Sequence, residues 1–325
     1  MKVLFSTYPM AFHTPGGGEV QLLAYQKHLP RHGVNVSLLD MWKPEFLNYD
    51  VVHFFSCISG SVHFCNFIKN LRIPLVISSS LWITEKTKHL YPIEEIRAQL
   101  SLADQIITNS RIESRTLSDV LDLPLEKFST VYNGIDSFFF EKASPNLFKE
   151  QYNISNRFVL NVGNLEPRKN QLSLVRAMRN FPNVKLVLIG HKRDASYAEQ
   201  VLKEGGDQVV YLGPMPHNQM LLSCYAACDL FCLPSTLETP GLAALEASAQ
   251  GAPLLLTSEG SCEEYFGDRA SYVSPDSLGE LRDAIDRSIS KADERTESLS
   301  SNFASESFSW LSTTKELQRI YKALV

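Results

Sequence analysis

Residues 238–246 read E-T-P-G-L-A-A-L-E, two carboxylates separated by seven residues with the start signal of a helix between them. Thr239 suits the N-cap, and Pro240 suits the first helical position, where its missing N–H costs nothing. Gly251 suits the end of the helix, where the chain commonly turns left-handed. The pattern therefore predicts Glu238 in the loop before a helix and Glu246 on that helix.

The apolar stripe Leu242, Leu245 and Ala249 marks the buried face of this helix, and Glu246 falls on the same face. A buried carboxylate is costly unless something hydrogen-bonds it. The N–H groups of Gly241 and Leu242, at the positive end of the helix, favour an anion. We therefore expect a phosphate beside a polyhydroxylated group. The alternative is a solvated loop carboxylate, a structural buried carboxylate and an ordinary helix.

Length and composition limit the class of protein. A chain of 325 residues predicts two domains of about 150 residues each, and two domains imply a cleft. With 44% hydrophobic residues, 21% charged residues and a net charge of −5, the chain is globular in type and a nucleic-acid partner is disfavoured. No apolar run approaches the roughly 20 residues that span a bilayer, and polar residues follow Met1 too early for a signal peptide. We expect a cytoplasmic protein.

Short apolar runs alternate with helical patterns along the chain, which predicts parallel sheets covered by helices on both faces. The runs are residues 3–5, 34–38, 51–55, 75–77, 106–108 and 130–132, then 158–162, 185–189, 209–212, 230–233, 253–256 and 271–273. A Phe-rich segment at 133–156 breaks the rhythm and is the predicted linker. The expected fold class is α/β, with two doubly wound domains at residues 1–145 and 146–307.

Ligands in such sheets bind beyond the carboxyl ends of the strands, so the loops there are candidates. The first loop holds Gly16, Gly17 and Gly18, which let a ligand approach the backbone closely at a helix start. Its spacing matches neither a Rossmann dinucleotide motif nor a P-loop. The alternative is a plain loop.

A second loop, residues 162–170, reads V-G-N-L-E-P-R-K-N. Arg168 and Lys169 at a helix start oppose the helix dipole and so favour a bound phosphate, with Asn170 as the expected cap. The alternative is a surface basic pair near Glu166. Together with residues 238–246, the three loops suit a nucleotide diphosphate sugar held in the cleft.

Cysteine usage and acidic spacing give no metal site. Cys224, Cys228 and Cys232 are spaced by four, but Cys232 lies in an apolar strand, so we interpret the three as small buried hydrophobes. The chain contains no D-x-D pair. Neither a metal nor a cofactor is expected.

Several short motifs now support a resemblance, and their order and spacing are specific. They are P-G-G-G-E-V at 15–20, D-V-V-H at 50–53, Y-N-G-I-D at 132–136, V-G-N-L-E-P-R-K-N at 162–170, L-I-G at 188–190, Y-L-G-P at 211–214, the stretch from L-P-S at 233–235 through 238–246 to G-A-P at 251–253, and E-E-Y-F-G-D at 263–268. The chain resembles the GT-B glycosyltransferases over essentially its whole length, and within them the retaining family 4 enzymes.

The resemblance implies an enzyme of GT-B fold that moves a sugar from a nucleotide diphosphate sugar to an acceptor hydroxyl, in polysaccharide or glycolipid synthesis. By that resemblance Glu246 binds the donor ribose, Glu238 sits at the donor sugar and Lys169 holds the diphosphate. The remaining implied donor-side positions are Gly163, Asn164, Gly190, Met215, Gly241 and Leu242. Residues 133–136 are the implied hinge, and an amphipathic helix at 308–325 is implied to pack back on the first domain.

Some positions depart from the family pattern. Asn164 stands where the family often has Arg, and Arg168 is the expected substitute for that charge. Ser80 stands where the family usually has His, and His53 and His13 are the candidates to contribute a similar contact. Gly16, Gly17, Gly18, His53 and Ser80 are therefore our acceptor-side and phosphate-loop candidates.

The leading hypothesis is retaining transfer, in which the leaving diphosphate takes the acceptor proton and no metal takes part. Lys169, Arg168 and helix amides then stabilise the departing charge. Two alternatives stay open: a nucleotide-sugar-binding protein that has lost catalysis, and a sugar-nucleotide 2-epimerase. The residues do not distinguish a GDP-linked from a UDP-linked donor, or a carbohydrate from a lipid-linked acceptor.

A membrane surface is a further candidate partner, which would place the protein at the inner face of a membrane. Two clusters in the first half mix apolar and basic groups: Phe64, Phe67, Ile68 and Lys69, and Trp82, Ile83, Lys86 and Lys88. The alternative interpretation is that the first cluster is core and the second an ordinary loop.

Overall fold

The computed structural model describes residues 1–13, 16–57, 60–290 and 307–325, which form two compact units. Unit 1 comprises Met1–Gly134 and Ser307–Val325, and unit 2 comprises Ile135–Glu306. Each unit has a six-stranded sheet whose pairings are all parallel. The prediction of two doubly wound α/β units is confirmed.

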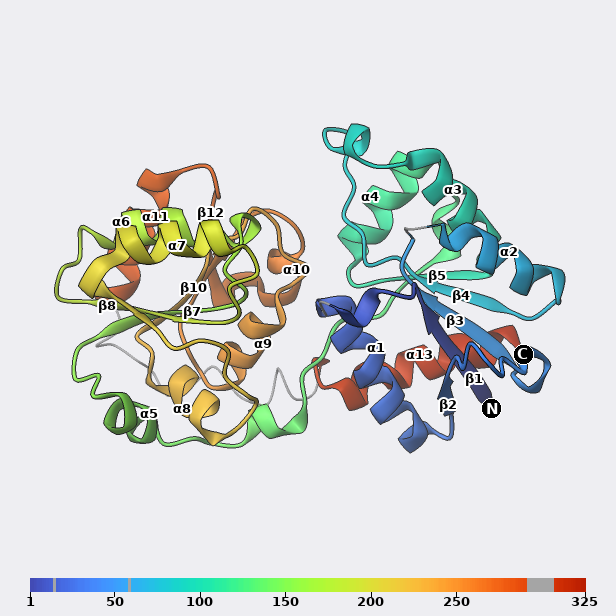
Figure 1. The fold of residues 1–325 in the computed structure, drawn as a ribbon, viewed down its shortest axis with the longest axis horizontal. Coiled ribbons are helices and arrows are strands. Elements are labelled where there is room, and N and C mark those ends of the chain that lie inside the picture. Colours follow the sequence, from blue (N-terminus) through green and yellow to red (C-terminus); the bar gives the residue numbers. More distant parts are fainter. Residues whose placement is uncertain (14–15, 58–59, 291–306) are drawn as a thin grey trace. The chain divides into compact units, whose positions relative to one another are not determined.

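Unit 1 has the strand order β2-β1-β3-β4-β5-β6. Its strands are β1 (Lys2–Thr7), β2 (Asn35–Leu38), β3 (Val51–Phe55), β4 (Leu75–Ser78), β5 (Gln105–Thr108) and β6 (Phe128–Thr130), and its helices are α1 (Gly17–His28), α2 (Ser61–Asn70), α3 (Ile93–Leu102), α4 (Arg111–Leu121) and α13 (Trp310–Leu324). Helices α2, α3 and α4 pack into one apolar core with the sheet, and α1 and α13 lie on the opposite face (Figure 1). Because both faces are covered, β3 and β4 are buried throughout.

Unit 2 has the strand order β12-β11-β10-β7-β8-β9. Its strands are β7 (Phe158–Val162), β8 (Lys185–Ile189), β9 (Val209–Tyr211), β10 (Leu230–Leu233), β11 (Leu254–Thr257) and β12 (Ala270–Val273), and its helices are α5 (Pro145–Tyr152), α6 (Gln171–Met178), α7 (Ala195–Gly205), α8 (Gln219–Ala227), α9 (Leu242–Ala249), α10 (Cys262–Phe266) and α11 (Leu278–Ser290). Helices α6, α7 and α11 share a core on one face, and α5, α8 and α9 cover the other (Figure 1).

Helix α13 joins unit 1 through contacts made along its length. The Trp310 and Tyr25 rings meet edge to face at 5.8 Å, and the Tyr321 hydroxyl lies 2.5 Å from His53 Nδ1 on the central strand β3. Gly134 fits against the start of the helix, since a Cβ there would lie 2.6 Å from the Trp310 nitrogen. Only glycine therefore fits where the chain leaves unit 1.

The boundary between the units falls after Gly134, so the predicted boundary after residue 145 is wrong. The chain that follows Gly134 already belongs to unit 2, because Phe139 is buried there and Gln250 Nε2 donates to its carbonyl at 2.7 Å. The predicted linker 133–156 is likewise wrong over most of its length, since α5 lies within it and packs on α8.

Two local predictions also need correction. Strand β6 covers Phe128–Thr130 and ends two residues before the predicted end, although Val131 N still donates to Thr108 O of β5 at 2.9 Å. The sequence S-L-G-E at 277–280 also predicts a capping box, which is only half formed: Ser277 Oγ accepts from Glu280 N at 3.2 Å, but the Glu280 carboxylate accepts from Ser274 N at 3.3 Å instead.

Candidate active site in unit 2

The strand order of unit 2 reverses direction between β7 and β10, which are neighbours in the sheet. In open α/β sheets the crevice beyond the carboxyl ends of such strands is the usual ligand position. The loop after β7 contains Lys169, and the loop after β10 contains Glu238. The two candidates that the sequence separates by 69 positions are therefore brought to one place.

Lys169 ends a short 3₁₀ helix, Pro167–Lys169, that follows β7. Its stem runs beside Gly163, where a Cβ would lie 3.3 Å from Lys169 Cε, so glycine makes room for the lysine. The ammonium reaches Glu238, with Nζ 2.5 Å from Oε1, and the lysine side chain is only 13% exposed. A largely buried cation thus faces a buried carboxylate.

The loop that holds Glu238 is fixed by its own backbone. Glu238 forms an isolated parallel bridge with Gly260: Glu238 N donates to Glu259 O at 3.2 Å, and Ser261 N donates to Glu238 O at 3.0 Å. Gly260 has φ 102°, and a Cβ there would lie 2.1 Å from the Glu238 carbonyl. Gly260 is required for this contact, which sequence analysis did not identify.

The charge on Glu238 is set by two opposing effects. Burial acts to raise the pKa of this carboxyl, but the cations Lys169 and Arg168 outweigh it and hold the pKa below its usual range. Glu238 is therefore ionised at neutral pH.

Arg168 lies at the rim of the pair and is about half exposed. Its Nη1 donates to the Leu237 carbonyl at 3.0 Å and lies 3.6 Å from Glu238 Oε1, while Nη2 donates to Glu166 at 3.2 Å. Arg168 thus braces the Glu238 loop as well as adding positive charge. Asn170 was predicted to cap α6, and it does stand at the N-cap position. Its side chain, however, makes no capping hydrogen bond, and its Nδ2 donates instead to the carbonyls of Pro234 and Pro275 at 3.0 Å.

Helix α9 begins at Leu242, two residues later than predicted, and its N-cap is Gly241. Gly241 has φ 85°, which no α-helix accommodates, so neither Thr239 nor Pro240 can belong to the start of the helix. A Cβ on Gly241 would lie 3.2 Å from Glu238 Oε2, so this end of α9 lies against the carboxylate. Gly251 has φ 74° after the helix, which confirms the predicted left-handed end.

Glu246 lies on the buried face of α9, as predicted, and is 6% exposed. Its Oε2 accepts a hydrogen bond from the Tyr225 hydroxyl of α8 at 2.7 Å, and His217 Nε2 lies 3.7 Å from Oε1. Burial raises the pKa of Glu246 to about 8. The protein therefore supplies a hydrogen-bond partner for one oxygen of this buried carboxylate.

Sequence analysis missed both Tyr225 and His217. A tyrosine in the largely apolar helix α8 was a signal, because a buried hydroxyl needs a partner. Nothing in the spacing of His217 pointed to Glu246.

The other predicted donor-side residues follow neighbouring strands of the same sheet. Gly190, after β8, has φ 150°, and a Cβ there would lie 2.1 Å from the Gly163 carbonyl. The Asn164 carbonyl accepts from Gln171 Nε2 at 2.9 Å, and Met215 lies half-buried in the loop after β9. The carboxyl edge of unit 2 therefore carries all the predicted donor-side positions.

In unit 1 the structure brings the glycine loop and Ser80 together. Helix α1 starts at Gly17, and the Glu19 carboxylate accepts from Gly16 N at 2.6 Å. A Cβ on Gly18 would lie 3.5 Å from Ser80 Oγ, and Ser80 is exposed with φ 48°. The first residues of the predicted glycine loop, 14 and 15, lie outside the described residues.

His53 is a core residue, so its assignment to the acceptor side is wrong. The side chain is fully buried on β3, with Nδ1 bonded to Tyr321 and Nε2 2.9 Å from Ser78 Oγ. Burial lowers the pKa of His53 to about 3. His13, by contrast, is exposed at the end of a short 3₁₀ helix, Ala11–His13.

The cysteines, which include Cys224, Cys228 and Cys232, are buried and form no disulfide, as expected of small hydrophobes. Within the described ranges no three His, Cys, Asp or Glu side chains gather as a metal site.

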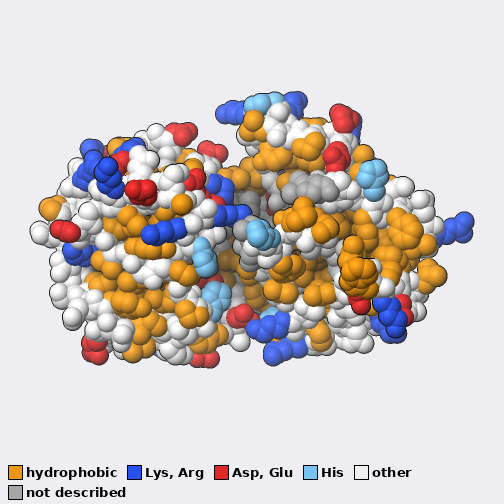
Figure 2. Space-filling view, in the orientation of Figure 1, with side chains coloured by type: hydrophobic (Ala, Val, Ile, Leu, Met, Phe, Trp, Pro, Cys, Tyr) orange, Lys and Arg blue, Asp and Glu red, His pale blue; other side chains and the backbone are white. Residues whose placement is uncertain are grey.

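Of the proposed membrane clusters, Ile68 and Ile83 are buried. Figure 2 shows hydrophobic side chains over much of the visible surface of each unit, so exposed apolar groups alone single out no membrane face. In the described part of the chain, no helix is both long and apolar enough to cross a bilayer.

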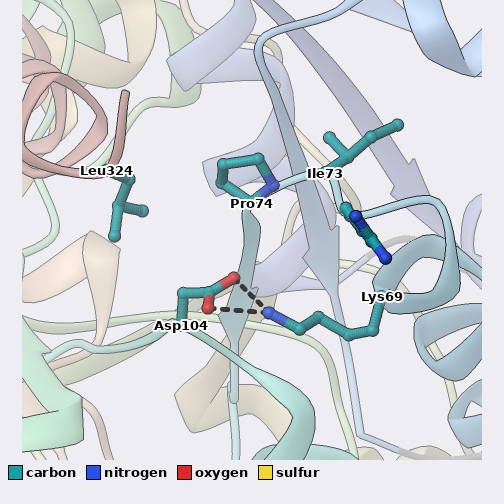
Figure 3. Close-up of a pocket in the computed structure, with 6 residues that line it drawn as sticks. Lys69, Ile73, Pro74, Asp104 and Leu324 are labelled. Atoms are coloured by element: carbon teal, nitrogen blue, oxygen red, sulfur yellow. Dashed lines mark hydrogen bonds and ion pairs between the residues drawn. The ribbon is translucent and has the colours of Figure 1, made fainter.

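A pocket of about 330 Å³ in unit 1 lies at the amino ends of its strands, opposite the carboxyl ends where ligands bind in such sheets (Figure 3). Pro74 and Asp104 each precede a strand, so the pocket borders the amino ends of β4 and β5. Lys69 Nζ is 2.7 Å from both Asp104 oxygens, and Asp104 also accepts from Leu75 N. The charges of Lys69 and Asp104 therefore neutralise each other. Because ligands in such sheets bind at the carboxyl ends of the strands, this pocket is not our candidate site.

Comparison with known families assigns the chain. The model described as "Glycosyl transferases group 1" matches residues 145–304, and the Glycosyltransferase Family 4 model matches residues 37–137. Together they cover most of both units. The chain belongs to the group 1 glycosyltransferases and has the GT-B fold.

Three relatives illustrate the similarity. The D-inositol 3-phosphate glycosyltransferase of Mycolicibacterium smegmatis is 26% identical over 293 residues, covering 84% of this chain and 67% of the relative. An uncharacterized glycosyltransferase of Methanocaldococcus jannaschii is 28% identical over 305 residues, covering 84% and 75%. The chain spans 62% of the D-inositol 3-phosphate glycosyltransferase of Mycobacterium bovis.

Solved structures share the fold at low identity. HepE of Anabaena, in complex with UDP, has a TM-score of 0.80 and 21% identity, covering 99% of this chain and all of HepE. Sucrose-phosphate synthase from Thermosynechococcus elongatus has a TM-score of 0.84 and 18% identity, covering 100% of this chain and 99% of the synthase.

Proposed function

We propose that this glycosyltransferase moves a sugar from a nucleotide diphosphate sugar to an acceptor hydroxyl with retention of configuration and without a metal ion. The observation that carries the proposal is the Lys169–Glu238 pair, which joins the loops after β7 and β10 at the reversal of strand order. A nucleotide in that position has a cation for its phosphates and a fixed carboxylate for its sugar.

Each donor group has a proposed partner in unit 2. Glu246 binds the ribose hydroxyls, and Lys169 with the amides of Gly241 and Leu242 binds the diphosphate. The ionised Glu238 orients hydroxyls of the donor sugar. Gly163, Asn164, Gly190 and Met215 border the nucleotide.

The proposed mechanism needs no protein nucleophile. As the bond between sugar and phosphate breaks, the leaving diphosphate takes the acceptor proton on the same face of the sugar. Negative charge grows on the diphosphate, and Lys169 is already positioned to neutralise it, with Arg168 adding a weaker contribution. A preorganised cation costs no reorganisation at that moment.

The choice of first substrates follows from the similar proteins. HepE was crystallised with UDP and with UDP-glucose, so uridine diphosphate sugars are the first donors to test, with GDP-linked sugars beside them. Gly16, Gly17, Gly18 and Ser80 form the proposed acceptor side in unit 1. We place the reaction in polysaccharide or glycolipid synthesis in the cytoplasm, at the inner face of a membrane where the acceptor is lipid-linked.

Product analysis tests the function. Donor and an acceptor panel are incubated with the protein, and the anomeric configuration of the product is read by NMR. A retained configuration supports the proposal, and an inverted one contradicts it. Thermal stabilisation by nucleotide without transfer would indicate a binding protein, and an epimer formed from donor alone would indicate a 2-epimerase.

Activity is expected to survive EDTA. The diphosphate charge is assigned to Lys169, Arg168 and helix amides, and the sequence has no D-x-D pair to hold a divalent ion. Initial rates are measured with and without chelator. Loss of turnover that magnesium or manganese restores would show that a metal takes part.

Ser80→His is expected to change the transfer rate or the sugar preference while nucleotide affinity stays within about twofold. Ser80 is exposed beside Gly18, and histidine tolerates its positive φ, so the imidazole can project from this loop. Ser80→Asn is the matched control, because asparagine tolerates the same backbone without an imidazole. If the two variants behave alike in kcat and preference, Ser80 is remote from the chemistry.

A further inference from the structure

The two oxygens of the Glu246 carboxylate have different surroundings. Oε2 accepts a 2.7 Å hydrogen bond from the buried Tyr225 hydroxyl. Oε1 faces His217, whose Nε2 lies 3.7 Å away. The His217 side chain is 56% exposed whereas that of Glu246 is 8% exposed, so His217 is the member of the pair that solvent reaches.

One contact fixes the backbone next to His217, and another contacts its ring. It precedes Asn218, whose Oδ1 accepts from Met220 N at 3.0 Å and from Leu221 N at 3.2 Å and so caps α8. The ring also packs edge-on against the buried Phe139, with centroids 5.0 Å apart. Its distance from Glu246 is therefore a property of the folded unit.

A separation of 3.7 Å is too long for a direct hydrogen bond but suits a shared hydroxyl. One oxygen can lie about 2.8 Å from both atoms, and a hydroxyl can donate to a carboxylate while accepting from an imidazole N–H. We propose that His217 is a second ribose-contacting residue, which binds with Glu246 a single ribose hydroxyl and so selects ribonucleotides over one deoxynucleotide.

The charge state of the ring agrees with this geometry. Burial lowers the pKa of His217, with the charge of Asp136 opposing that shift. A ring that is neutral at pH 7 can carry its proton on Nε2 and donate it to the hydroxyl. The proposal rests on the ribose-binding role of Glu246 given under the proposed function.

Calorimetry with UDP, 2′-deoxy-UDP and 3′-deoxy-UDP tests the inference, with the GDP series in parallel. In the parent, one deoxynucleotide should bind at least tenfold more weakly than its ribonucleotide. His217→Ala should reduce that discrimination about fivefold, leaving affinity for that deoxynucleotide unchanged, since one hydrogen bond is lost. His217→Gln, which retains an N–H donor, should restore part of the discrimination. His89→Ala, at an exposed histidine of unit 1, is the matched control.

Three results separate failure of this inference from failure of the function. If His217→Ala and His217→Gln weaken ribonucleotide and both deoxynucleotides equally, His217 is structural and the inference is wrong. If neither variant changes any affinity, water and not a ribose hydroxyl lies between His217 and Glu246, and the inference is also wrong. If the parent binds no UDP or GDP, the proposed function itself fails, and this inference with it.

Discussion

Lys169→Ala is expected to lower kcat at saturating donor by about 100- to 1000-fold, with a much smaller change in donor Kd. The charge that Lys169 faces grows as the sugar–phosphate bond breaks, so its contribution is larger in the transition state than in the bound donor. Arg168→Ala should cost less, because Arg168 is half exposed and also bonded to the loop carbonyl of Leu237. The double variant should exceed either single variant.

The Lys169–Glu238 ion pair determines which control variants this experiment needs. Removing Lys169 leaves Glu238 buried beside only the more distant Arg168, and breaking such a pair typically costs about 3 to 5 kcal/mol of stability. Lys169→Met combined with Glu238→Gln removes both charges and should recover the melting temperature but not kcat. A Lys169→Ala enzyme with parental kcat and only a raised KM would show uniform binding and refute the leaving-group role.

Glu246→Gln is expected to weaken nucleotide binding by about 10- to 100-fold, the effect of losing a charged hydrogen bond of roughly 1.5 to 3 kcal/mol. The amide oxygen can still accept from Tyr225, so the melting temperature should change little. Glu246→Ala is a poorer probe, because it leaves the buried Tyr225 hydroxyl without its acceptor. Parental affinity in the glutamine variant, measured by calorimetry, would exclude the ribose role.

The pH dependence of binding gives an independent reading of the same residue. Burial raises the pKa of Glu246 from 4.5 to about 8, so in the free protein it is largely protonated at pH 6 and largely ionised at pH 9. Ribose hydroxyls donate best to the ionised form. Nucleotide affinity should therefore fall as pH falls through 8, by at most about tenfold per unit.

Glu246→Gln should flatten this profile. The stability of the fold should depend on pH in the opposite sense. The folded state holds the proton of the Glu246 carboxyl more tightly than the unfolded chain does. The contribution of Glu246 to the free energy of unfolding therefore declines as pH rises from 4.5 to 8. A flat binding profile in the parent would contradict the prediction.

The strands were predictable because most are short apolar runs bounded by turn residues, and the central ones, such as β3, β4, β10 and β11, are buried throughout. Strands β7 and β10 match the predicted ends, and both carry the site. The unit boundary was not predictable in this way. The segment after Gly134 resembles a linker in composition, and its membership of unit 2 depends on contacts such as Phe139 with Gln250, which are distant in sequence.

The site was predictable where a local signal exists and not where the fold alone creates the contact. Lys169 and Glu238 follow strand ends, so their loops could be named, but their ion pair depends on β7 and β10 being neighbours. Helix α9 starts two residues after its predicted start, because the positive φ of Gly241 is not evident from the sequence E-T-P-G. His53 was misjudged because an isolated histidine in an apolar strand does not reveal its two buried partners.

Because α13 belongs to the same unit as Met1–Gly134, unit 1 cannot be completed in the order in which the chain is synthesised. The ribosome must translate the whole of unit 2 in between, which at about 5–20 residues per second takes on the order of 10 to 30 s. Throughout that interval Tyr25 of α1 lacks its contact with Trp310, and the His53 ring on β3 lacks its tyrosine partner. Unit 2 is continuous in sequence and can fold first, so we expect the incompletely packed apolar surface of the nascent chain to lie mainly in its earlier half.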